Sequence, residues 1–548
     1  MLIVLFFIAN RAAYKGYFHD DDFDNAAWTP RTGLDEYATT LISPVFSRTN
    51  FRPLGHLYFR VLSQTAGMRF PPYVAGLQFL HLVNAFLLWR LLRKLKFDEL
   101  AALGGVVFFL FHPATFDAYW QPMYIFDVLC TLFGILSLTL WIDRRWIWSF
   151  VCFWVAYKSK EIAVMLPVVL LAYEWWLGER KWKPLIPFFL VSLSFGVQAI
   201  VANRQTHDTY TFKFTADTIV DTFFFYAQRL PGSPWGWIVI ALMLYLVYDR
   251  RVWFGLVSGL VLLLPLLALP GRQFAVYLYA PLAFLAAAVA STIAKRPKLI
   301  LPAFLVVWIP LTYAAMRDYR KTALTYADEN RRYVAVMEQF LKDNPSTNTF
   351  LYDGHPYWLN IWGIEGAFRM ITHREDVPLA AVDSPESKAL KQVPDLAVLG
   401  WDNIFRKVEI TKRDPAHPYE SFVQVGQHTP LWQYGDGWFP REGSFRWMQP
   451  QADARVYRPE GATKFQVIVN MNQLQRERTG PQTLEVLFNG KVIGRHEFAY
   501  AGWQRPTFDI PPAPSGVINV VFRAEPAYRP EGDPRVLGFA IGGFGFLP

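Results

Sequence analysis

Charged residues are scarce in this chain. They make up 18% of its 548 residues, while 53% are hydrophobic and 17% are aromatic. A soluble protein carries charge on about a quarter of its residues, so this composition excludes an ordinary soluble domain and favours a multi-pass membrane protein. The formal net charge of +9 does not indicate a nucleic-acid partner, because Lys and Arg cluster directly after apolar runs. That pattern is typical of membrane orientation.

Cysteine is almost absent. The two cysteines, Cys130 and Cys152, both fall in apolar segments. Their number and placement exclude a disulfide framework and a thiolate metal site. The sequence also lacks any Asn-x-Ser/Thr glycosylation sequon with x other than Pro, which favours a bacterial protein over one of the eukaryotic secretory pathway.

Long apolar runs are abundant instead. About eleven of them follow one another, separated by polar connections, and each is expected to be a membrane-spanning helix. The runs are Met1–Ala13, Tyr73–Leu92, Leu100–Thr115, Tyr124–Ile142, Trp146–Tyr157, Ile162–Leu177, Leu185–Ala202, Trp235–Tyr248, Val252–Leu269, Tyr277–Ile293 and Leu299–Ala315.

Every second connection between these runs is short and basic. Arg93-Lys94 follows the second run and Arg144-Arg145 follows the fourth. Because positive loops stay in the cytoplasm, they predict the orientation of all the spans. The opposite connections, and everything after the last run, are then expected outside. We therefore expect a protein of the cytoplasmic (inner) membrane whose C-terminal region is periplasmic or otherwise external.

The composition changes beyond Arg317. Residues 318–437 predict an external amphipathic helix, Asp318–Asp343, followed by a strand at Thr349–Tyr352 and a small α/β region. In residues 438–548 short strands alternate with turns, and Asn489-Gly490 predicts a hairpin, so we expect an external, jelly-roll-like β-sandwich. The predicted fold is an α-helical multi-pass membrane domain at residues 1–317 with a C-terminal soluble α/β plus β-sandwich region.

Four carboxylates lie within five residues directly after the first apolar run, at Asp20, Asp21, Asp22 and Asp24. Acids in a row repel one another and resist burial, so they favour contact with water, a cation or a substrate proton. Placed where a membrane helix meets water, they are candidate catalytic residues. The alternative is a solvated loop that caps a helix, because Asp at a helix start accepts hydrogen bonds from free N–H groups.

Two further acids are expected on the same side of the membrane. Asp117 lies in an external connection after His112-Pro113, where it could act as a base, a metal ligand or a clamp for an acceptor. The alternative is again a loop aspartate that caps the next helix. Asp127 lies a little inside the following span, where an ionisable group is costly and usually functional.

Cations accompany these acids. Lys160 lies at a helix break and could hold a lipid-linked phosphate, although a Lys160–Glu161 pair that satisfies itself explains the residues equally well. Arg272 could be a second phosphate ligand or could only extend toward the membrane surface. Arg52 is another cationic candidate. Glu161 and Tyr277 complete the predicted substrate-binding set.

Six short motifs occur along the chain: Phe18-His19-Asp20-Asp21, Asn50-Phe51-Arg52-Pro53-Leu54, His81-Leu82-Val83-Asn84, His112-Pro113 with Asp117-Ala118, Ser159-Lys160-Glu161 and Tyr279-Ala280-Pro281. Their content and order resemble the motifs of GT-C membrane glycosyltransferases. The resemblance is greatest to the family-39-type protein O-mannosyltransferases and the animal transmembrane-and-TPR mannosyltransferases, although no TPR repeat follows here. The chain departs from their pattern in having Asp117 for Glu, no Gly-Arg before Asp127, and Val276 in place of an arginine.

The resemblance implies that the protein takes a sugar from a polyprenyl-phosphate donor on the outer side of the membrane. An acceptor hydroxyl of a glycan, a protein or a lipid would attack the sugar with inversion. The general base would be Asp21 or Asp22, with Asp20 as the alternative, and Asp117 would position the acceptor. The departing phosphate would be held by three cations, Lys160, Arg272 and Arg52.

No cofactor is assigned, but a divalent cation at the acidic stretch stays open, with His19 as the only obvious nitrogen ligand beside it.

Two other functions compete with transfer. The chain could be a flippase or export component for lipid-linked glycans, with the acids lining a passage. It could also be a membrane-anchored carbohydrate-binding protein, in which Trp438, Trp447 and Trp503 stack on sugars. Against the last, aromatic residues in a small sandwich are more often core.

Overall fold

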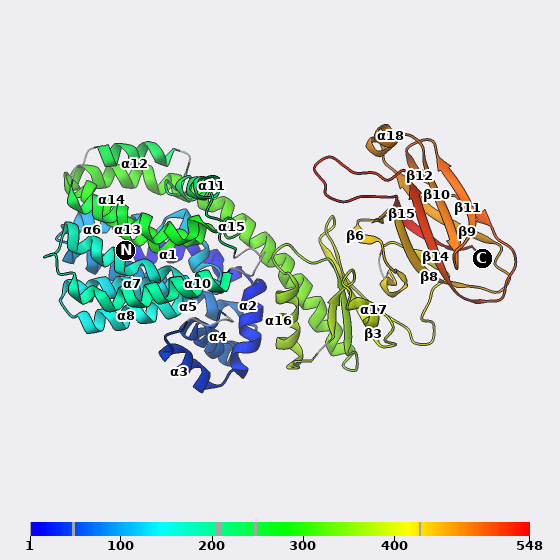
Figure 1. The fold of residues 1–548 in the computed structure, drawn as a ribbon, viewed down its shortest axis with the longest axis horizontal. Coiled ribbons are helices and arrows are strands. Elements are labelled where there is room, and N and C mark those ends of the chain that lie inside the picture. The colour runs from blue at the N-terminus through cyan, green and yellow to red at the C-terminus, as the bar shows by residue number, and fades with distance from the viewer. Residues whose placement is uncertain are drawn as a thin grey trace. The chain divides into compact units, whose positions relative to one another are not determined.

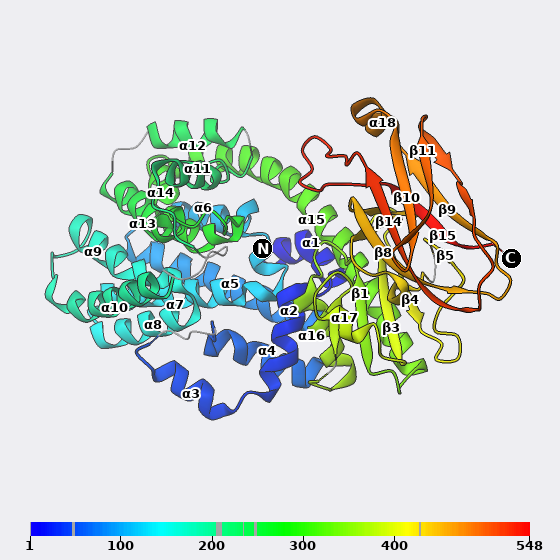
Figure 2. The same ribbon diagram turned by 45° about the vertical axis from the view of Figure 1, so that its right-hand side comes forward.

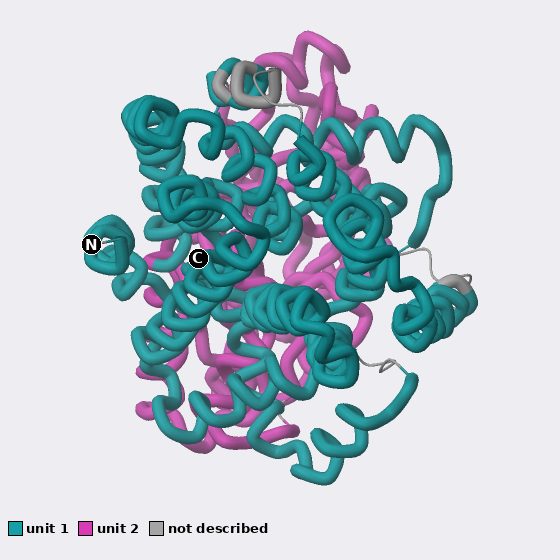
Figure 3. Tube along the Cα trace, turned by 90° about the vertical axis from the view of Figure 1, so that its left-hand side faces the viewer, with its two compact units in different colours: residues 1–327 teal, residues 328–548 magenta. Residues whose placement is uncertain are grey.

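The computed structural model describes residues 2–45, 50–203, 211–233, 235–245, 249–376, 378–426 and 429–547. Within this part of the chain, helices occupy the first half and strands begin only after residue 348 (Figure 1). The chain divides into two compact units, Met1–Ala327 and Asp328–Pro548, which have separate colours in Figure 3.

The first unit is helical. Its α-helices are α1 (Leu2–Asn10), α2 (Asp20–Trp28), α3 (Leu34–Ile42), α4 (Pro53–Ala66), α5 (Phe70–Lys94), α6 (Glu99–Leu110), α7 (Ile125–Ile142), α8 (Trp146–Ser159), α9 (Leu166–Trp176), α10 (Ile186–Asn203), α11 (Ala216–Ala227), α12 (Gly236–Tyr245), α13 (Arg250–Leu267), α14 (Tyr279–Ala294) and α15 (Pro297–Asp343). Short 3₁₀ segments join several of them: η1 (Arg11–Lys15), η2 (Thr29–Arg31), η3 (Pro113–Thr115), η4 (Asp117–Tyr119), η5 (Pro122–Tyr124), η6 (Glu161–Met165), η7 (Lys183–Leu185) and η8 (Ala275–Leu278).

Five helical stretches of the described residues are long and apolar enough to cross a membrane: Phe70–Lys94, Pro122–Ile142, Arg250–Leu267, Ala275–Ile293 and Pro297–Asp343. By length and composition they support a multi-pass membrane protein. Each of the eleven predicted runs contains a helix, but several are short for the roughly 20 residues that a span requires, such as α1 with nine and α9 with 11. The number eleven is therefore not confirmed. The run at 235–248 also ends on residues 246–248, which lie outside the described residues.

The last predicted span and the predicted amphipathic helix form a single element. The 47 residues of α15 continue without a break through Pro302 and Pro310, and the boundary between the two compact units falls within it. The sequence predicted a boundary at residue 317 because the side chains change there from apolar to charged. This change does not interrupt the backbone hydrogen bonds, so the helix continues across it.

A buried polar cluster ties three helices of the first unit together. His81 Nδ1 lies 2.7 Å from the hydroxyl of Tyr279, and Asn84 Nδ2 donates to the same oxygen at 3.1 Å. Asn84 also donates to the carbonyl of Val128 at 2.9 Å, so α5, α7 and α14 are joined. Side chains that hydrogen-bond between apolar helices fix their packing. Three residues of the sequence motifs, His81, Asn84 and Tyr279, thus stabilise the helix packing that positions the loop before α14.

The second unit begins with a four-stranded sheet in the order β2-β1-β3-β4. Its elements are β1 (Thr349–Asp353), α16 (Ile361–Thr372), β2 (Leu379–Ala381), α17 (Ser387–Leu390), β3 (Leu396–Asp402) and β4 (Lys407–Lys412). The strand β1 pairs in parallel with β2 and β3, whereas β4 is antiparallel. The five residues of β1 are all buried, as expected for a central strand between two neighbours.

Two facing sheets follow, at the end of the chain that is orange to red in Figure 2. Four strands have the order β11-β10-β14-β8, and a seven-stranded sheet contains β12-β9-β15-β7-β6 with β5 and β13 at its margins. The bounds are β5 (Phe422–Gln424), β6 (Trp438–Glu442), β7 (Phe445–Met448), β8 (Gln451–Arg458), β9 (Lys464–Met471), β10 (Gln482–Phe488), β11 (Lys491–Phe498), β12 (Gly502–Gln504), β13 (Thr507–Asp509), β14 (Gly516–Glu525) and β15 (Ala540–Phe546); α18 (Gln473–Thr479) follows β9.

The β-rich C-terminal region is therefore confirmed. The predicted hairpin joins β10 to β11, with positive φ at Asn489 (46°) and Gly490 (85°), the backbone geometry of a two-residue hairpin turn. The sandwich includes β5, which precedes residue 438. Trp438 and Trp447 are buried and only Trp503, 49% exposed, presents its ring to solvent, so two of the three candidate sugar platforms belong to the core.

Candidate functional site

The acidic stretch forms the first turn of α2. His19 precedes the helix in extended conformation, and its N–H donates to Asp22 Oδ2 at 2.9 Å. The other oxygen of Asp22 accepts the N–H of Met123 at 2.6 Å. Asp22 is fully buried and both of its oxygens hold backbone groups, so it links α2 to η5. Burial raises its pKa to about 8 in spite of these two donors, and burial lowers the pKa of His19 to about 3.

Asp21, one residue earlier, is exposed, whereas Asp22 is buried. The surrounding protein nevertheless raises the pKa of its carboxyl, because partial desolvation outweighs the attraction of three nearby cations, Arg272, Lys160 and Arg52. Asp21 is thus a carboxylate that water reaches and on which three cations act electrostatically. Asp20, the first residue of the helix, is half-buried.

Two of these cations come from a helix start and a helix break. Arg52 lies in extended conformation before Pro53, which begins α4 at the position where proline is favoured. Lys160 is also extended and separates α8 from η6. Lys160 is extended whereas Glu161 begins η6, and the two side chains have different partners.

The resulting ion pairs connect distant parts of the chain. Lys160 Nζ lies 3.0 Å from Asp127 Oδ2 on α7, and Arg52 Nη2 lies 2.6 Å from Glu161 Oε1. The interpretation that Lys160 and Glu161 satisfy each other is therefore wrong. Asp127 is buried, and its ion pair explains how a carboxylate is accommodated inside an apolar helix. The four residues alternate in charge and leave no net charge among them.

Two tyrosines and Arg272 surround these pairs. Lys160 Nζ lies 5.0 Å from the centre of the Tyr277 ring, a cation–π contact. The guanidinium of Arg272 lies 5.4 Å from the ring of Phe274, and its carbonyl accepts a hydrogen bond from Tyr226 at 3.4 Å. Arg272, Lys160 and Asp127 all act electrostatically on Tyr277. The structure thus brings together every predicted substrate-binding residue.

Asp117 lies at the edge of the same cluster. It begins η4, in a series of 3₁₀ turns that start at His112-Pro113, and Gln121 Nε2 donates to its Oδ1 at 3.4 Å. Burial raises its pKa to about 6. Tyr124 joins it to the rest, because this phenol acts electrostatically with Asp117, Tyr277, Asp127 and Asp21. Sequence reasoning missed Tyr124, since a tyrosine at the start of an apolar run carries no signal that separates it from other aromatic residues near a membrane surface.

No group of three or more His, Cys, Asp or Glu side chains able to hold a metal ion occurs in the described ranges. Asp22 is already engaged on both oxygens, and its neighbour Asp21 is exposed. Chemically, the cluster presents one accessible carboxylate, Asp21, beside cations that are suited to an anionic group such as a phosphate.

No protein-family model and no curated protein matches the chain. Among solved structures, two cryo-EM structures of arabinofuranosyltransferase AftD from Mycobacteria, one of them a mutant, resemble it with 13% sequence identity and TM-scores of 0.41 and 0.40. Both cover 99% of this chain, and the chain spans 58% and 60% of theirs. At this identity and TM-score the likeness assigns no function.

Proposed function

We propose that this protein is a membrane glycosyltransferase of the GT-C type. It transfers a sugar from a polyprenyl-phosphate donor to an acceptor hydroxyl of a glycan, a protein or a lipid, on the external side of the cytoplasmic membrane. The observation that carries the proposal is an accessible carboxylate, Asp21, within electrostatic reach of three cations, Arg272, Lys160 and Arg52. A base and a set of anion-binding cations are the two elements that such a transfer requires.

In the proposed reaction, the acceptor oxygen attacks the anomeric carbon while the bond from that carbon to the phosphate oxygen breaks. The hydroxyl proton passes to the carboxylate of Asp21, and the electron pair of the broken bond stays on the polyprenyl phosphate. A single displacement inverts the anomeric centre. The cations stabilise the negative charge that grows on the leaving phosphate, where fixed charges lower the barrier most.

The general base is assigned to Asp21 rather than to its neighbours. Both oxygens of Asp22 accept backbone N–H groups and its side chain is fully buried, so it has no face left for an acceptor. Asp20 is the half-buried first residue of the helix. The raised pKa of Asp21 suits a base, since proton affinity closer to neutrality makes proton acceptance more favourable.

The acids of the two ion pairs act as positioning residues in this proposal. Glu161 holds Arg52 and Asp127 holds Lys160, so both cations are aimed before the donor arrives. When the donor binds, each cation interacts with the donor phosphate as well as with its own carboxylate. Asp117, with its pKa raised to about 6, acts electrostatically on Tyr124 and orients the acceptor hydroxyl.

The test is transfer of labelled sugar in membranes. Membranes that contain the full chain are supplied with polyprenyl-phosphate sugars carrying a heavy-isotope label, and the glycans, proteins and lipids are analysed by mass spectrometry. Asp21→Asn should reduce labelled product by about 10²–10⁴-fold, the range for loss of a general base. Asp35→Asn is the matched control, an exposed acid in the first turn of the neighbouring helix α3. Full transfer by the Asp21 variant would reject the proposed site.

A further inference from the structure

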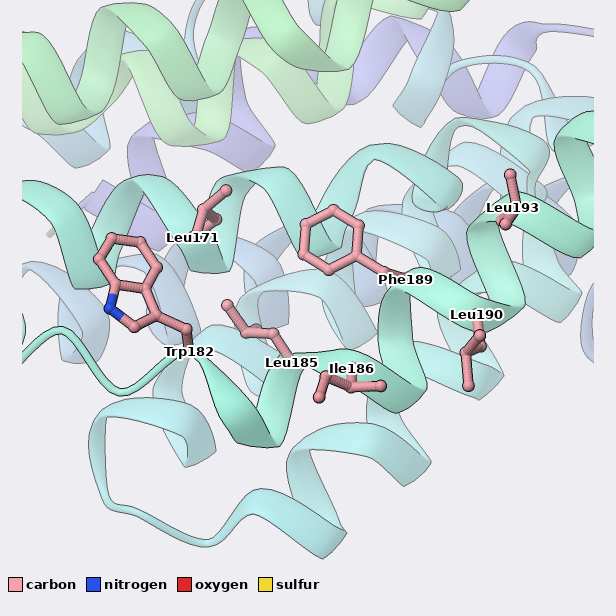
Figure 4. A pocket seen from close by; sticks show the side chains of 7 residues that line it. All are labelled: Leu171, Trp182, Leu185, Ile186, Phe189, Leu190 and Leu193. Carbon is pink, nitrogen blue, oxygen red and sulfur yellow. The ribbon is translucent and has the colours of Figure 1, made fainter.

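An apolar hollow of about 470 Å³ lies between α9 and the start of α10 and shares no lining residue with the acidic site. Its size is within the roughly 300–1,000 Å³ of typical ligand pockets. Figure 4 shows the indole of Trp182 at one end and side chains of α10 along its length. The lining residues are Leu171, Trp182, Leu185, Ile186, Phe189, Leu190 and Leu193. Because every lining side chain is apolar and Leu190 and Leu193 are 61% and 65% exposed, the hollow fits a hydrocarbon chain.

The loop at the Trp182 end is held in one conformation by a buried acid. Glu174 is fully buried on α9, and its Oε2 accepts the N–H groups of Glu179 and Lys181, both at 3.0 Å. Its other oxygen accepts Trp141 Nε1 and Arg144 Nη1. A Cβ at Gly178 would lie 2.6 Å from Glu174 Oε2, so glycine is needed for this approach. A loop that is already ordered loses less conformational entropy when a ligand binds.

The fixed loop presents two cations next to the hollow. Arg180, exposed, has a left-handed backbone with φ of 61°, and its guanidinium lies over the ring of Trp175 at 5.8 Å. Trp175 in turn packs edge to face against Trp182. Lys183, also exposed, follows Trp182 directly. In the described part of the chain no ion pair involves Arg180 or Lys183, whereas Lys181 is paired with Glu179 at 3.1 Å.

We propose that this loop and the hollow form a binding site for an anionic phospholipid. One acyl chain occupies the hollow, and the phosphate lies between Arg180 and Lys183. The charge of the loop is complementary to such a headgroup, and basic residues directly beside a membrane helix are typical of anionic-lipid binding. The loop is one of the basic connections expected in the cytoplasm, so the lipid belongs to the cytoplasmic leaflet. The site is separate from the acidic cluster and does not depend on sugar transfer.

Native mass spectrometry of the full chain in detergent tests the proposal. The protein is titrated with dioleoyl phosphatidylglycerol or with dioleoyl phosphatidylcholine, two lipids that share their acyl chains and differ in net charge. We expect phosphatidylglycerol to bind at least tenfold more tightly. The double variant Arg180→Gln/Lys183→Gln should lose about 25-fold of that affinity, about fivefold per cation, and should lose less affinity for phosphatidylcholine, because choline offsets the charge of its phosphate. Leu190→Trp, which fills the hollow from an exposed position, should weaken both lipids.

The matched control removes two exposed cations from another basic connection, Arg296→Gln/Lys298→Gln. It should bind phosphatidylglycerol like the unaltered protein. Equal affinity of the unaltered protein for the two lipids would overturn the proposal. So would an equal loss in the control, which would show attraction by overall charge, or tight lipid binding by the Leu190 variant, which would place the acyl chain elsewhere.

Discussion

Replacing Asp22 by Asn should weaken the fold, whereas replacing Asp21 by Asn should not. The two oxygens of Asp22 accept the N–H groups of His19 and Met123 at 2.9 and 2.6 Å. An Asn side chain has one acceptor oxygen, so its NH₂ group must face one of these donors inside the protein. The lost bond and the unsatisfied buried N–H should cost about 1–3 kcal/mol of unfolding free energy.

The pH dependence of this difference follows from the raised pKa of Asp22. Burial raises it to about 8 in the folded protein, above its value of about 4 in an unfolded chain. Its contribution to stability is therefore fully present below about pH 4 and is lost as the pH rises through about 8. The Asn variant has no such titration, so its deficit should be largest in acid, should shrink as the pH rises, and should reverse by about pH 8, where the ionised Asp22 destabilises the fold.

The assay is thermal or chemical denaturation of the detergent-purified full chain, followed by tryptophan fluorescence between pH 4 and 8, beside the sugar-transfer assay. The Asp21 variant should unfold like the unaltered protein and lose transfer. The Asp22 variant should unfold more readily than the unaltered protein at the acid end of this range, and the difference should vanish as the pH rises. If Asp22→Asn is as stable as the unaltered protein while Asp21→Asn unfolds early, the division of roles between these neighbours is wrong.

Three further outcomes follow from the structure. Burial raises the pKa of Asp117 to about 6, so kcat/KM should rise with pH through about 6 as this carboxylate forms, and Asp117→Asn should remove that rise from the pH profile. Lys160→Met leaves the buried Asp127 without its cation and should lower the free energy of unfolding by about 3–5 kcal/mol. The double variant Lys160→Met/Asp127→Asn should recover most of this loss. Equal losses in denaturation of the single and double variants would argue against coupling between the two residues. Gly490→Val should lower the stability of the β-sandwich by about 1–2 kcal/mol, because its φ of 85° is unfavourable for a side chain although no atom lies within 4 Å; an unchanged melting temperature would contradict this.

The sequence predicted the local elements of this protein well where one physical signal decides them. Asn489-Gly490 specifies a hairpin because few residue pairs adopt positive φ twice in succession. Apolar runs placed the helices because a bilayer requires them. The number of spans was harder, since 3₁₀ turns such as η6 shorten helices at positions that hydropathy does not mark.

The division of roles among the acids could not be predicted from composition. Asp21 and Asp22 are identical in chemistry, and only the position at which α2 begins decides which one turns inward. Asp22 is the third residue of the helix and reaches back to the N–H of His19. An acidic residue at the third helical position often accepts the N–H of the N-cap residue. This motif is recognised in a sequence when the N-cap is Ser or Thr, and here the N-cap is His19.

The ion pairs depend on long-range packing. Lys160 and Glu161 are adjacent in sequence, which suggested a pair, but they form ion pairs with Asp127 and Arg52 instead. These partners are 33 and 109 residues away along the chain. Such contacts follow from the assembly of several helices and have no local signature.

The most direct test of the proposed function is a cryo-EM structure of the full chain with polyprenyl phosphate bound. The proposal predicts a phosphate in contact with Arg52, Lys160 and Arg272, on the side that the carboxylate of Asp21 faces. A phosphate bound at another place, with Asp21 and these cations left in contact with water alone, would contradict it.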